Sequence, residues 1–477
     1  MEMPRNIGPF HIVGIGGIGM SAIAEILLES GYTVQGSDAK ESANVRRLRN
    51  RGIRVFIGHD PVNLIGARYV VISSAIKRDN AELMTARARG IPVIRRADML
   101  AELMRKRKPV SVTGTHGKTT TTSLIAHIFE SAKLDPTVIT GGIMNSWGSN
   151  ARLGRGDWLV VEADESDGTF IRIPTQIGVV TNIDPEHLDY FGSVEKMEAD
   201  YRTFYAGIPF YGTAVTCIDH PVVRKMLVDA AEEICCKVLT YGIAEDADLK
   251  LRNVRSDRGS MLFDVEVGPR VAGGSRIILG LSMPLPGDHN ALNSLAALAV
   301  CAEAGIDDDL IRPALARFSG VKRRFTQTGI WNGVTFYDDY AHHPVEVAAT
   351  LKAARRTTRD RVIAIFQPHR YSRVSSLFDD FSACFSDADI VIVTPIYSAG
   401  EPPLPGIDHI AMAAGIRRAG HPQVLAVESE QELAPVIARL SRPGDLVVGL
   451  GAGTITDWSN ALPEWLADTK KAAGGAT

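Results

Sequence analysis

A phosphate loop of unusual spacing lies between residues 110 and 123, which read VSVTGTHGKTTTTS. In the common form, G-x-x-x-x-G-K-[ST], backbone amides surround the phosphate oxygens, the lysine counters their charge and the hydroxyl joins magnesium. Here the loop is shortened to T-G-T-H-G-K-T, because its two glycines are Gly114 and Gly117. These residue types predict an ATP site, with Lys118 at the β- and γ-phosphates and Thr119 at the metal.

Two acidic segments follow predicted strands downstream of this loop. WLVVEADESD places Glu162 and Glu165 at and beyond the end of an apolar run. VVTNIDPEHLDYFGS places Asp184 and His187 after the next run. The carboxyl ends of parallel strands share one edge of a sheet, where α/β proteins bind their ligands. Because hard cations prefer oxygen ligands and accept an imidazole, we expect a magnesium site beside the phosphate loop.

Another glycine cluster, which we call the first glycine cluster because it precedes the phosphate loop in the chain, lies in HIVGIGGIGMSAIAEILLESGYTVQGSD. Gly14, Gly16 and Gly19 form G-x-G-x-x-G between a predicted strand and a predicted helix, and Asp38 ends the next strand. Glycines at such a turn let backbone amides approach a pyrophosphate at the helix N-terminus. The pattern indicates a bound diphosphate, and leaves open whether NAD or another nucleotide carries it.

The elements that position these residues alternate between short apolar runs and amphipathic stretches along almost the whole chain. This alternation favours an α/β fold with mostly parallel sheets, and 477 residues are too many for one core. We expect three domains. They are a Rossmann-like N-terminal domain at residues 1–109, a central phosphate-loop ATPase domain at residues 110–322, and a Rossmann-like C-terminal domain at residues 323–477.

Composition excludes several classes of protein. A net charge of -3 gives no reason to expect nucleic acid or an acidic membrane surface as a partner. The five cysteines contain no C-x-x-C pair and are typical of buried thiols in a reducing compartment. The first residues show no signal-peptide core, and no apolar run reaches membrane-spanning length. We therefore expect a cytoplasmic protein that has neither nucleic acid nor a membrane as a partner.

Seven motifs occur in collinear order: TGTHGKTTT, VVEADESD, TNIDPEHLDYFGS, PGDHNALN, GVKRRF, YDDYAHHP and FQPHRYSR. Together they resemble the Mur ligase family of bacterial cell-wall enzymes, in which the phosphate loop has the same shortened form. The resemblance covers the whole chain. It assigns the first glycine cluster to the diphosphate of a UDP-sugar in place of NAD.

The resemblance also implies a role for residues of every motif. The ATP-binding residues would be Gly114, Thr115, His116, Gly117, Lys118, Thr119, Thr120, Asn290, Asn293, Arg324 and Asp339. The substrate-binding residues would be Gly14, Gly16, Gly17, Gly19, Asp38, His342, His343, His369, Arg370 and Arg373. The magnesium ligands would be Thr119, Glu162 and His187, with Glu165 as the alternative to Glu162. The catalytic residues would be Lys118, Arg324 and His187.

The activity implied is an ATP-dependent ligation in peptidoglycan synthesis. L-alanine is joined to the lactyl carboxylate of UDP-N-acetylmuramate through an acyl phosphate, and ADP and phosphate are released. A related recycling ligase, which joins the same sugar nucleotide to a ready-made peptide, is the alternative. YDDYAHHP and FQPHRYSR favour the alanine enzyme, although Ala341 stands where glycine is common. A nicotinamide oxidoreductase leaves the ATP loop unexplained, and a phosphate-loop switch leaves the N-terminal diphosphate site unexplained.

Overall fold

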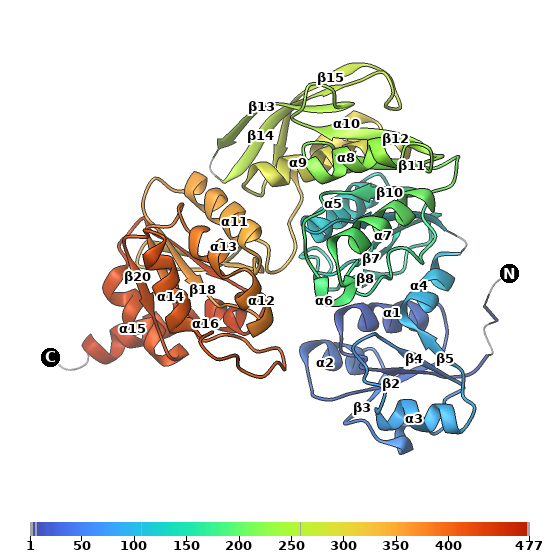
Figure 1. The fold of residues 1–477 in the computed structure, drawn as a ribbon, viewed down its shortest axis with the longest axis horizontal. Coiled ribbons are helices and arrows are strands. Elements are labelled where there is room, and N and C mark those ends of the chain that lie inside the picture. The colour runs from blue at the N-terminus through green and yellow to red at the C-terminus, as the bar shows by residue number, and fades with distance from the viewer. Residues whose placement is uncertain (1–2, 5–6, 106, 258, 475–477) are drawn as a thin grey trace. The chain divides into compact units, whose positions relative to one another are not determined.

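The computed structural model describes residues 3–4, 7–105, 107–257 and 259–474. It contains three α/β sheets, with five, ten and six strands, which confirms the expected fold class (Figure 1). Contacts divide the chain into two compact units. The first is Met1–Asn253, Phe263–Leu281 and Leu292–Ser319, and the second is Val254–Leu262, Ser282–Ala291 and Gly320–Thr477. No helix in the described ranges is long and apolar enough to cross a membrane.

The N-terminal domain is a parallel five-stranded sheet in the order β3-β2-β1-β4-β5. Its strands are β1 (Phe10–Val13), β2 (Val34–Asp38), β3 (Arg54–Ile57), β4 (Tyr69–Ile72) and β5 (Val93–Arg95). Its helices are α1 (Ile18–Glu29), α2 (Ala43–Asn50), the 3-10 turn η1 (Pro61–Leu64), α3 (Ala81–Ala88) and α4 (Arg96–Met104). The strand order reverses beside β1, and the glycine cluster follows β1, so the cluster lies where open α/β sheets bind ligands.

The middle domain contains a ten-stranded sheet in the order β15-β14-β13-β12-β11-β10-β6-β9-β7-β8. Its strands are β6 (Lys108–Thr113), β7 (Thr137–Ile139), β8 (Ala151–Arg152), β9 (Trp158–Glu162), β10 (Ile177–Val180), β11 (Thr213–Cys217), β12 (Lys237–Gly242), β13 (Leu249–Asp257), β14 (Ser260–Val267) and β15 (Arg276–Met283). Its helices are α5 (Lys118–Ser131), α6 (Leu188–Phe191), α7 (Val194–Ala206), α8 (Pro221–Asp229), α9 (Asp288–Glu303) and α10 (Asp308–Ala316). The strand β6, which leads into the phosphate loop, lies between the two strands that lead into the acidic segments.

The C-terminal domain is a six-stranded sheet in the order β16-β17-β21-β18-β19-β20, in which only the edge strand β16 is antiparallel to its neighbour. The strands are β16 (Thr326–Trp331), β17 (Val334–Asp339), β18 (Val362–Phe366), β19 (Ile390–Val393), β20 (Val424–Ala426) and β21 (Leu446–Leu450). The helices are α11 (Pro344–Thr357), α12 (Tyr371–Ser376), α13 (Phe378–Ala383), α14 (His409–Arg418), α15 (Glu430–Leu440) and α16 (Ile455–Gly474).

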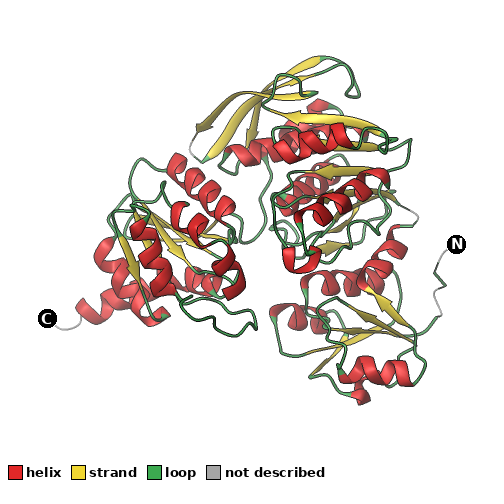
Figure 2. Ribbon diagram, in the orientation of Figure 1, coloured by secondary structure: helices red, strands yellow, loops and turns green. Residues whose placement is uncertain are grey.

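The central strand β18 shows why this last sheet is covered on both faces (Figure 2). Alternate side chains of a strand point to opposite faces. Ala364 and Phe366 belong to a core with residues of α11, α13 and α14. Ile363 and Ile365 belong to a second core with residues of α15 and α16. The continuous apolar run of the strand is therefore buried on both sides, as in other doubly wound parallel sheets.

Candidate active site

The first glycine cluster forms a tight turn between β1 and α1. The amides of Gly14 and Ile15 donate to the Ser37 carbonyl, and the Gly16 amide donates to Asp38 Oδ2 at 2.8 Å. Asp38 thus holds the turn in shape. The N-cap residue, Gly17, makes no side-chain cap. The first amides of α1 therefore have no intrahelical acceptor and point toward the position that an anion would take.

The phosphate loop joins β6 to α5, and the first of its two glycine positions, Gly114, requires glycine. Gly114 has φ +123°, and a Cβ there would lie 2.1 Å from Thr181 Oγ1. Gly117, at φ +83°, is the N-cap of α5. A Cβ on Gly117 would approach Asn293 Oδ1 to 2.7 Å, so Asn293, one of the expected ATP-binding residues, lies directly beside the loop. The remaining loop candidates, Thr115, His116 and Thr120, lie between or just after these glycines.

Lys118 is folded back over the loop that it follows. Its Nζ donates to the carbonyls of Gly114 at 2.6 Å and Thr115 at 2.9 Å, and to Glu165 Oε1 at 2.8 Å. Burial alone would lower the pKa of Lys118, but Glu165 and Asp164 raise it above its usual value. The loop therefore carries a fixed cation, which a bound triphosphate needs to offset its charge.

Glu162, the last residue of β9, connects the phosphate loop to the end of β7. Its Oε1 accepts from Thr119 Oγ1 at 2.9 Å. Its Oε2 accepts from Thr140 Oγ1 at 3.2 Å and from the Gly141 amide at 2.5 Å. The parallel register of β6 and β9, in which Val112 lies opposite Glu162, brings this carboxylate to the hydroxyl. The predicted meeting of strand ends is therefore present.

Glu165 lies on the other side of Lys118 and faces His187. His187 Nε2 is 3.8 Å from Glu165 Oε1, and His187 has φ +55°, a conformation that few non-glycine residues adopt. Burial raises the pKa of Glu165 to about 7, against the effect of Lys118. Its Oε2 is buried and makes no hydrogen bond to any described residue. Such an atom fits a cation, because hard cations prefer oxygen ligands. No group of three or more His, Cys, Asp or Glu side chains among the described residues is arranged to hold a metal ion, so the magnesium site stays a prediction.

His220 was not predicted from the sequence, and it belongs to the same edge of the sheet. Its Nε2 lies 3.1 Å from Asp184 Oδ1, while His116 Nε2 lies 3.4 Å from Asp184 Oδ2. The Asp184 amide donates to Thr115 Oγ1 at 2.8 Å. The acidic segment after β10 therefore holds the phosphate loop from the side opposite to Glu162. No motif marks His220, because it reaches Asp184 only through the pairing of β10 with β11.

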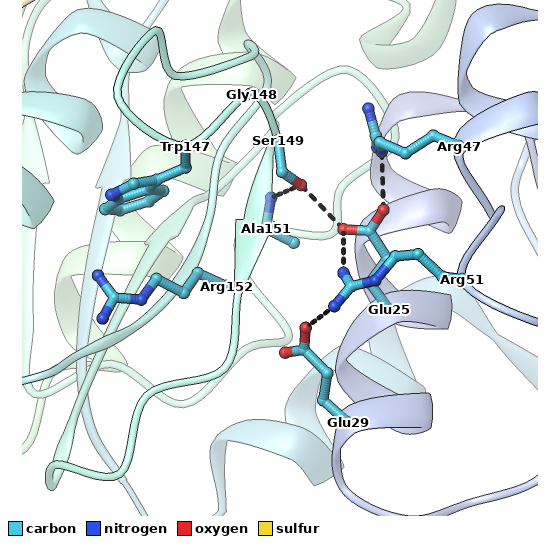
Figure 3. A pocket seen from close by; sticks show the side chains of 9 residues that line it. All are labelled: Glu25, Glu29, Arg47, Arg51, Trp147, Gly148, Ser149, Ala151 and Arg152. Carbon is cyan, nitrogen blue, oxygen red and sulfur yellow. Dashed lines mark hydrogen bonds and ion pairs between the residues drawn. The ribbon is translucent and has the colours of Figure 1, made fainter.

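A pocket of about 420 Å³ lies where α1 and α2 meet residues 147–152 of the middle domain (Figure 3). Glu25 is 1% exposed there, accepts from Arg47 Nε and Ser149 Oγ at 2.8 Å each, and pairs with Arg51 at 3.4 Å. The charged side chains of the pocket thus pair with opposite charges. Its lining contains no residue of either predicted nucleotide site, so this polar cluster ties two domains together.

The second unit contains three further predicted site residues, Asp339, Arg324 and Asn290. Asp339 accepts from the amides of Phe325 at 2.7 Å and Ala341 at 2.8 Å, and burial raises its pKa against the attraction of Arg324. The Arg324 guanidinium lies 5.3 Å from the ring centre of Tyr340. Asn290 Nδ2 donates to the Pro286 carbonyl at 2.7 Å. Asp339 thereby fixes the segment that carries Arg324.

A cluster of histidines and arginines follows β17 and β18 in this unit. His342 and His369 meet edge to face with ring centres 5.7 Å apart, and His369 stacks on Tyr397 at 5.6 Å. Arg373 Nη1 lies 3.1 Å from His369 Nδ1. Burial, together with His342 and Arg373, lowers the pKa of His369 to about 3. His369 is therefore a neutral ring among cations, and His343 is the buried N-cap of α11.

Glu401 is a second residue that sequence reasoning missed. Arg370 Nε donates to Glu401 Oε1 at 2.5 Å, and Ser372 donates to the same carboxylate through its amide and its hydroxyl. Although partial burial opposes the shift, Ser372 and Arg370 lower the pKa of Glu401 to about 2. Arg370, one of the predicted substrate-binding residues, is thus positioned by a carboxylate that comes from a loop without any recognisable motif.

Three family models match the chain in order. They are described as the Mur ligase family catalytic domain at residues 9–108, the Mur ligase middle domain at residues 112–301, and the Mur ligase glutamate ligase domain at residues 323–453. A UDP-N-acetylmuramate–L-alanine ligase from Bradyrhizobium sp. is 55% identical over 466 residues, which cover 98% of this chain and 99% of the relative.

Solved structures are similar over the same length. The UDP-N-acetylmuramate-alanine ligase of Thermotoga maritima has a TM-score of 0.82 at 29% identity, over 97% of this chain and 100% of that one. A murein peptide ligase from Psychrobacter arcticus has a TM-score of 0.69 at 23% identity, over 97% and 99% of the two chains, which is a likeness of fold. The chain belongs to the Mur ligase family.

Proposed function

We propose that this chain joins L-alanine to the lactyl carboxylate of UDP-N-acetylmuramate at the expense of ATP. Family membership and a relative of that name at 55% identity support the reaction. The observation that carries it is the arrangement around the phosphate loop. Thr119 contacts Glu162 and Lys118 contacts Glu165, so the hydroxyl and the cation that follow the loop each meet a carboxylate at or just beyond the end of β9.

The chemistry follows from the poor reactivity of a carboxylate toward an amine. A carboxylate oxygen attacks the γ-phosphorus of ATP, ADP leaves, and an acyl phosphate forms. The alanine amine then attacks the acyl carbon, and the tetrahedral intermediate collapses to the amide and inorganic phosphate. Phosphoryl transfer depends on positioning and on neutralising charge. Lys118 and Arg324 supply positive charge for these steps.

Magnesium would be held by Thr119, Glu162 and His187, with Glu165 as the alternative carboxylate. The buried, unpaired Oε2 of Glu165 supports a cation at this place. When bound, the ion would offset the charge of the transferring phosphoryl group. The protein's own contribution is to fix the loop through Glu162 and to keep Lys118 charged.

The substrates are assigned to separate domains. Residues 1–109 bind the UDP-sugar through Gly14, Gly16, Gly17 and Gly19, residues 110–322 bind ATP, and residues 323–477 bring L-alanine. His369, Arg370 and Arg373 help to seat the amino acid carboxylate, and His342 or His343 faces the active site. Because ATP and UDP-sugars are cytoplasmic metabolites, we place the reaction in the cytoplasm.

Phosphate release tests the reaction and the intermediate together. The enzyme should release phosphate from ATP at full rate only when UDP-N-acetylmuramate and L-alanine are both present. When the lactyl carboxylate carries a heavy oxygen isotope, one labelled oxygen should appear in the phosphate. Turnover with neither co-substrate, or phosphate without the label, would overturn the proposal. Release that requires a tripeptide in place of L-alanine would favour the recycling ligase.

A further inference from the structure

Arg96, the first residue of α4, lies beside both the first glycine cluster and an acidic segment. Its Nη2 donates to Asp167 Oδ2 at 2.8 Å and to Thr169 Oγ1 at 3.1 Å. Its Nη1 lies 2.9 Å from the place that a Cβ on Gly19 would take. These residues all belong to the first compact unit. None of the recognised motifs contains Arg96, and the roles discussed above leave it unused.

The charge of Arg96 opposes two helix dipoles, and among the described residues Asp167 at 2.8 Å and Asp164 at 3.8 Å offset it. A cation at a helix N-terminus opposes the helix dipole, and Arg96 lies at the start of α4 while its guanidinium also approaches the start of α1. The amides of Gly14, Ile15, Gly16 and Gly17 already have acceptors within the turn. The amides of Ile18, Gly19 and Met20 follow a cap without a side chain. Guanidinium and open amides therefore converge at Gly19.

The glycine at position 19 has a separate explanation in this geometry. Gly19 has an ordinary helical backbone, so its lack of a side chain is not required by φ. A methyl group there would press against Arg96 Nη1. The absence of a side chain at Gly19 thus leaves space for the Arg96 guanidinium and for a ligand bound to it.

We propose that Arg96 is a substrate-binding residue whose guanidinium binds the diphosphate of the UDP-sugar at the first turn of α1. This inference rests on the proposed function, which places that diphosphate in the N-terminal domain. A guanidinium forms paired, charge-assisted hydrogen bonds with phosphate oxygens. Asp167 holds Arg96 toward the site, and its negative charge competes with the phosphate.

Substitutions of Arg96 and of Asp167 should have different effects on the affinity for UDP. Arg96→Gln removes the charge that binds the diphosphate, so the affinity for UDP should fall about ten- to a hundredfold, as for other hydrogen bonds to charged groups. Asp167→Asn removes the competing charge and keeps a side-chain oxygen that accepts a hydrogen bond, so UDP should bind at least as tightly as to the wild type. If the pair were only a link between domains, both variants would weaken binding alike.

Calorimetry with UDP and with ATP on the wild type and both variants tests this inference. The expected result is a loss of UDP affinity in Arg96→Gln alone, unchanged ATP affinity in both variants, and a raised KM for UDP-N-acetylmuramate in Arg96→Gln. Wild-type UDP affinity in Arg96→Gln, or equal losses in the two variants, would overturn it. Absence of UDP binding by the wild-type protein would instead overturn the proposed function, so the two failures are distinguishable.

Discussion

Thr119 Oγ1 lies 2.9 Å from Glu162 Oε1, and this contact joins the first helical turn after the phosphate loop to the end of the neighbouring strand. The carboxylate also accepts from Thr140 and Gly141, so its position is fixed from three directions. Glu165 differs, because its Oε2 has no hydrogen bond from the described part of the chain. The Glu162 carboxylate is therefore held by the protein through both oxygens, whereas Glu165 has one oxygen that could contact a ligand.

Removal of the loop lysine should abolish ligation and spare sugar-nucleotide binding. Lys118→Ala deletes the cation that contacts Gly114, Thr115 and Glu165. The turnover number should fall at least about a hundredfold, as when one electrostatic donor is lost from other active sites. Calorimetry should show nearly unchanged affinity for UDP-N-acetylmuramate. Lys225→Ala, on the exposed face of α8, is the control and should keep full activity. An equal loss of sugar affinity in Lys118→Ala would contradict the assignment.

The two carboxylates should both affect the requirement for magnesium. Glu162→Gln and Glu165→Gln each weaken one oxygen donor beside Thr119 and Lys118. We expect the half-saturating Mg²⁺ concentration to rise about tenfold or more in each variant, in the range found when metal sites lose a supporting contact. Glu195→Gln, on the surface of α7, serves as the control. If only one variant shifts the Mg²⁺ titration, that residue alone is the metal carboxylate.

His187 should behave as a ligand and not as a packed residue. His187→Ala should slow turnover, and high Mg²⁺ or Mn²⁺, which accepts nitrogen more readily, should partly restore it. The midpoint of thermal unfolding should change little, because His187 is only partly buried. A loss of a few kcal/mol of stability without rescue by metal would be the signature of a cavity, and would remove His187 from the site.

The partly buried ring of His369 should make the stability of the protein depend on pH. Its pKa is lowered from 6.5 to about 3 in the folded protein, so between these values the unfolded chain binds the extra proton. Stability should therefore fall as the pH drops from 6.5 toward 3, by up to about 1.4 kcal/mol per pH unit for this group. Urea unfolding at pH 7 and pH 5 should show a smaller loss in His369→Asn than in the wild type. Parallel losses in the two proteins would contradict the shift.

Sequence patterns predicted the local turns. They also predicted one contact between distant residues, because all parallel sheets bring the carboxyl ends of neighbouring strands to the same edge. The turns at Gly14 and Gly114 follow from strand–glycine–helix patterns, and the meeting of Thr119 with Glu162 follows from the shared edge of parallel strands. Substrate binding by Asp38 stays a prediction, and in the structure its carboxylate accepts a hydrogen bond from the Gly16 amide.

Other contacts depend on the three-dimensional path of the chain. Arg96 reaches Asp167 across 71 positions, His220 reaches Asp184 across 36, and Arg370 reaches Glu401 across 31. No periodicity or motif encodes such pairs. They arise where neighbouring strands or domains bring loops together, and only the folded chain shows them.

Mass spectrometry of the ligation product tests the central claim most directly. The protein is incubated with ATP, Mg²⁺ and UDP-N-acetylmuramate, together with L-alanine in one reaction and with the L-alanyl tripeptide in another. The account predicts a sugar nucleotide heavier by one alanyl residue in the first reaction and little or no product in the second. A tripeptide adduct without any alanine adduct, or no adduct in either reaction from folded protein that binds both nucleotides, would contradict it.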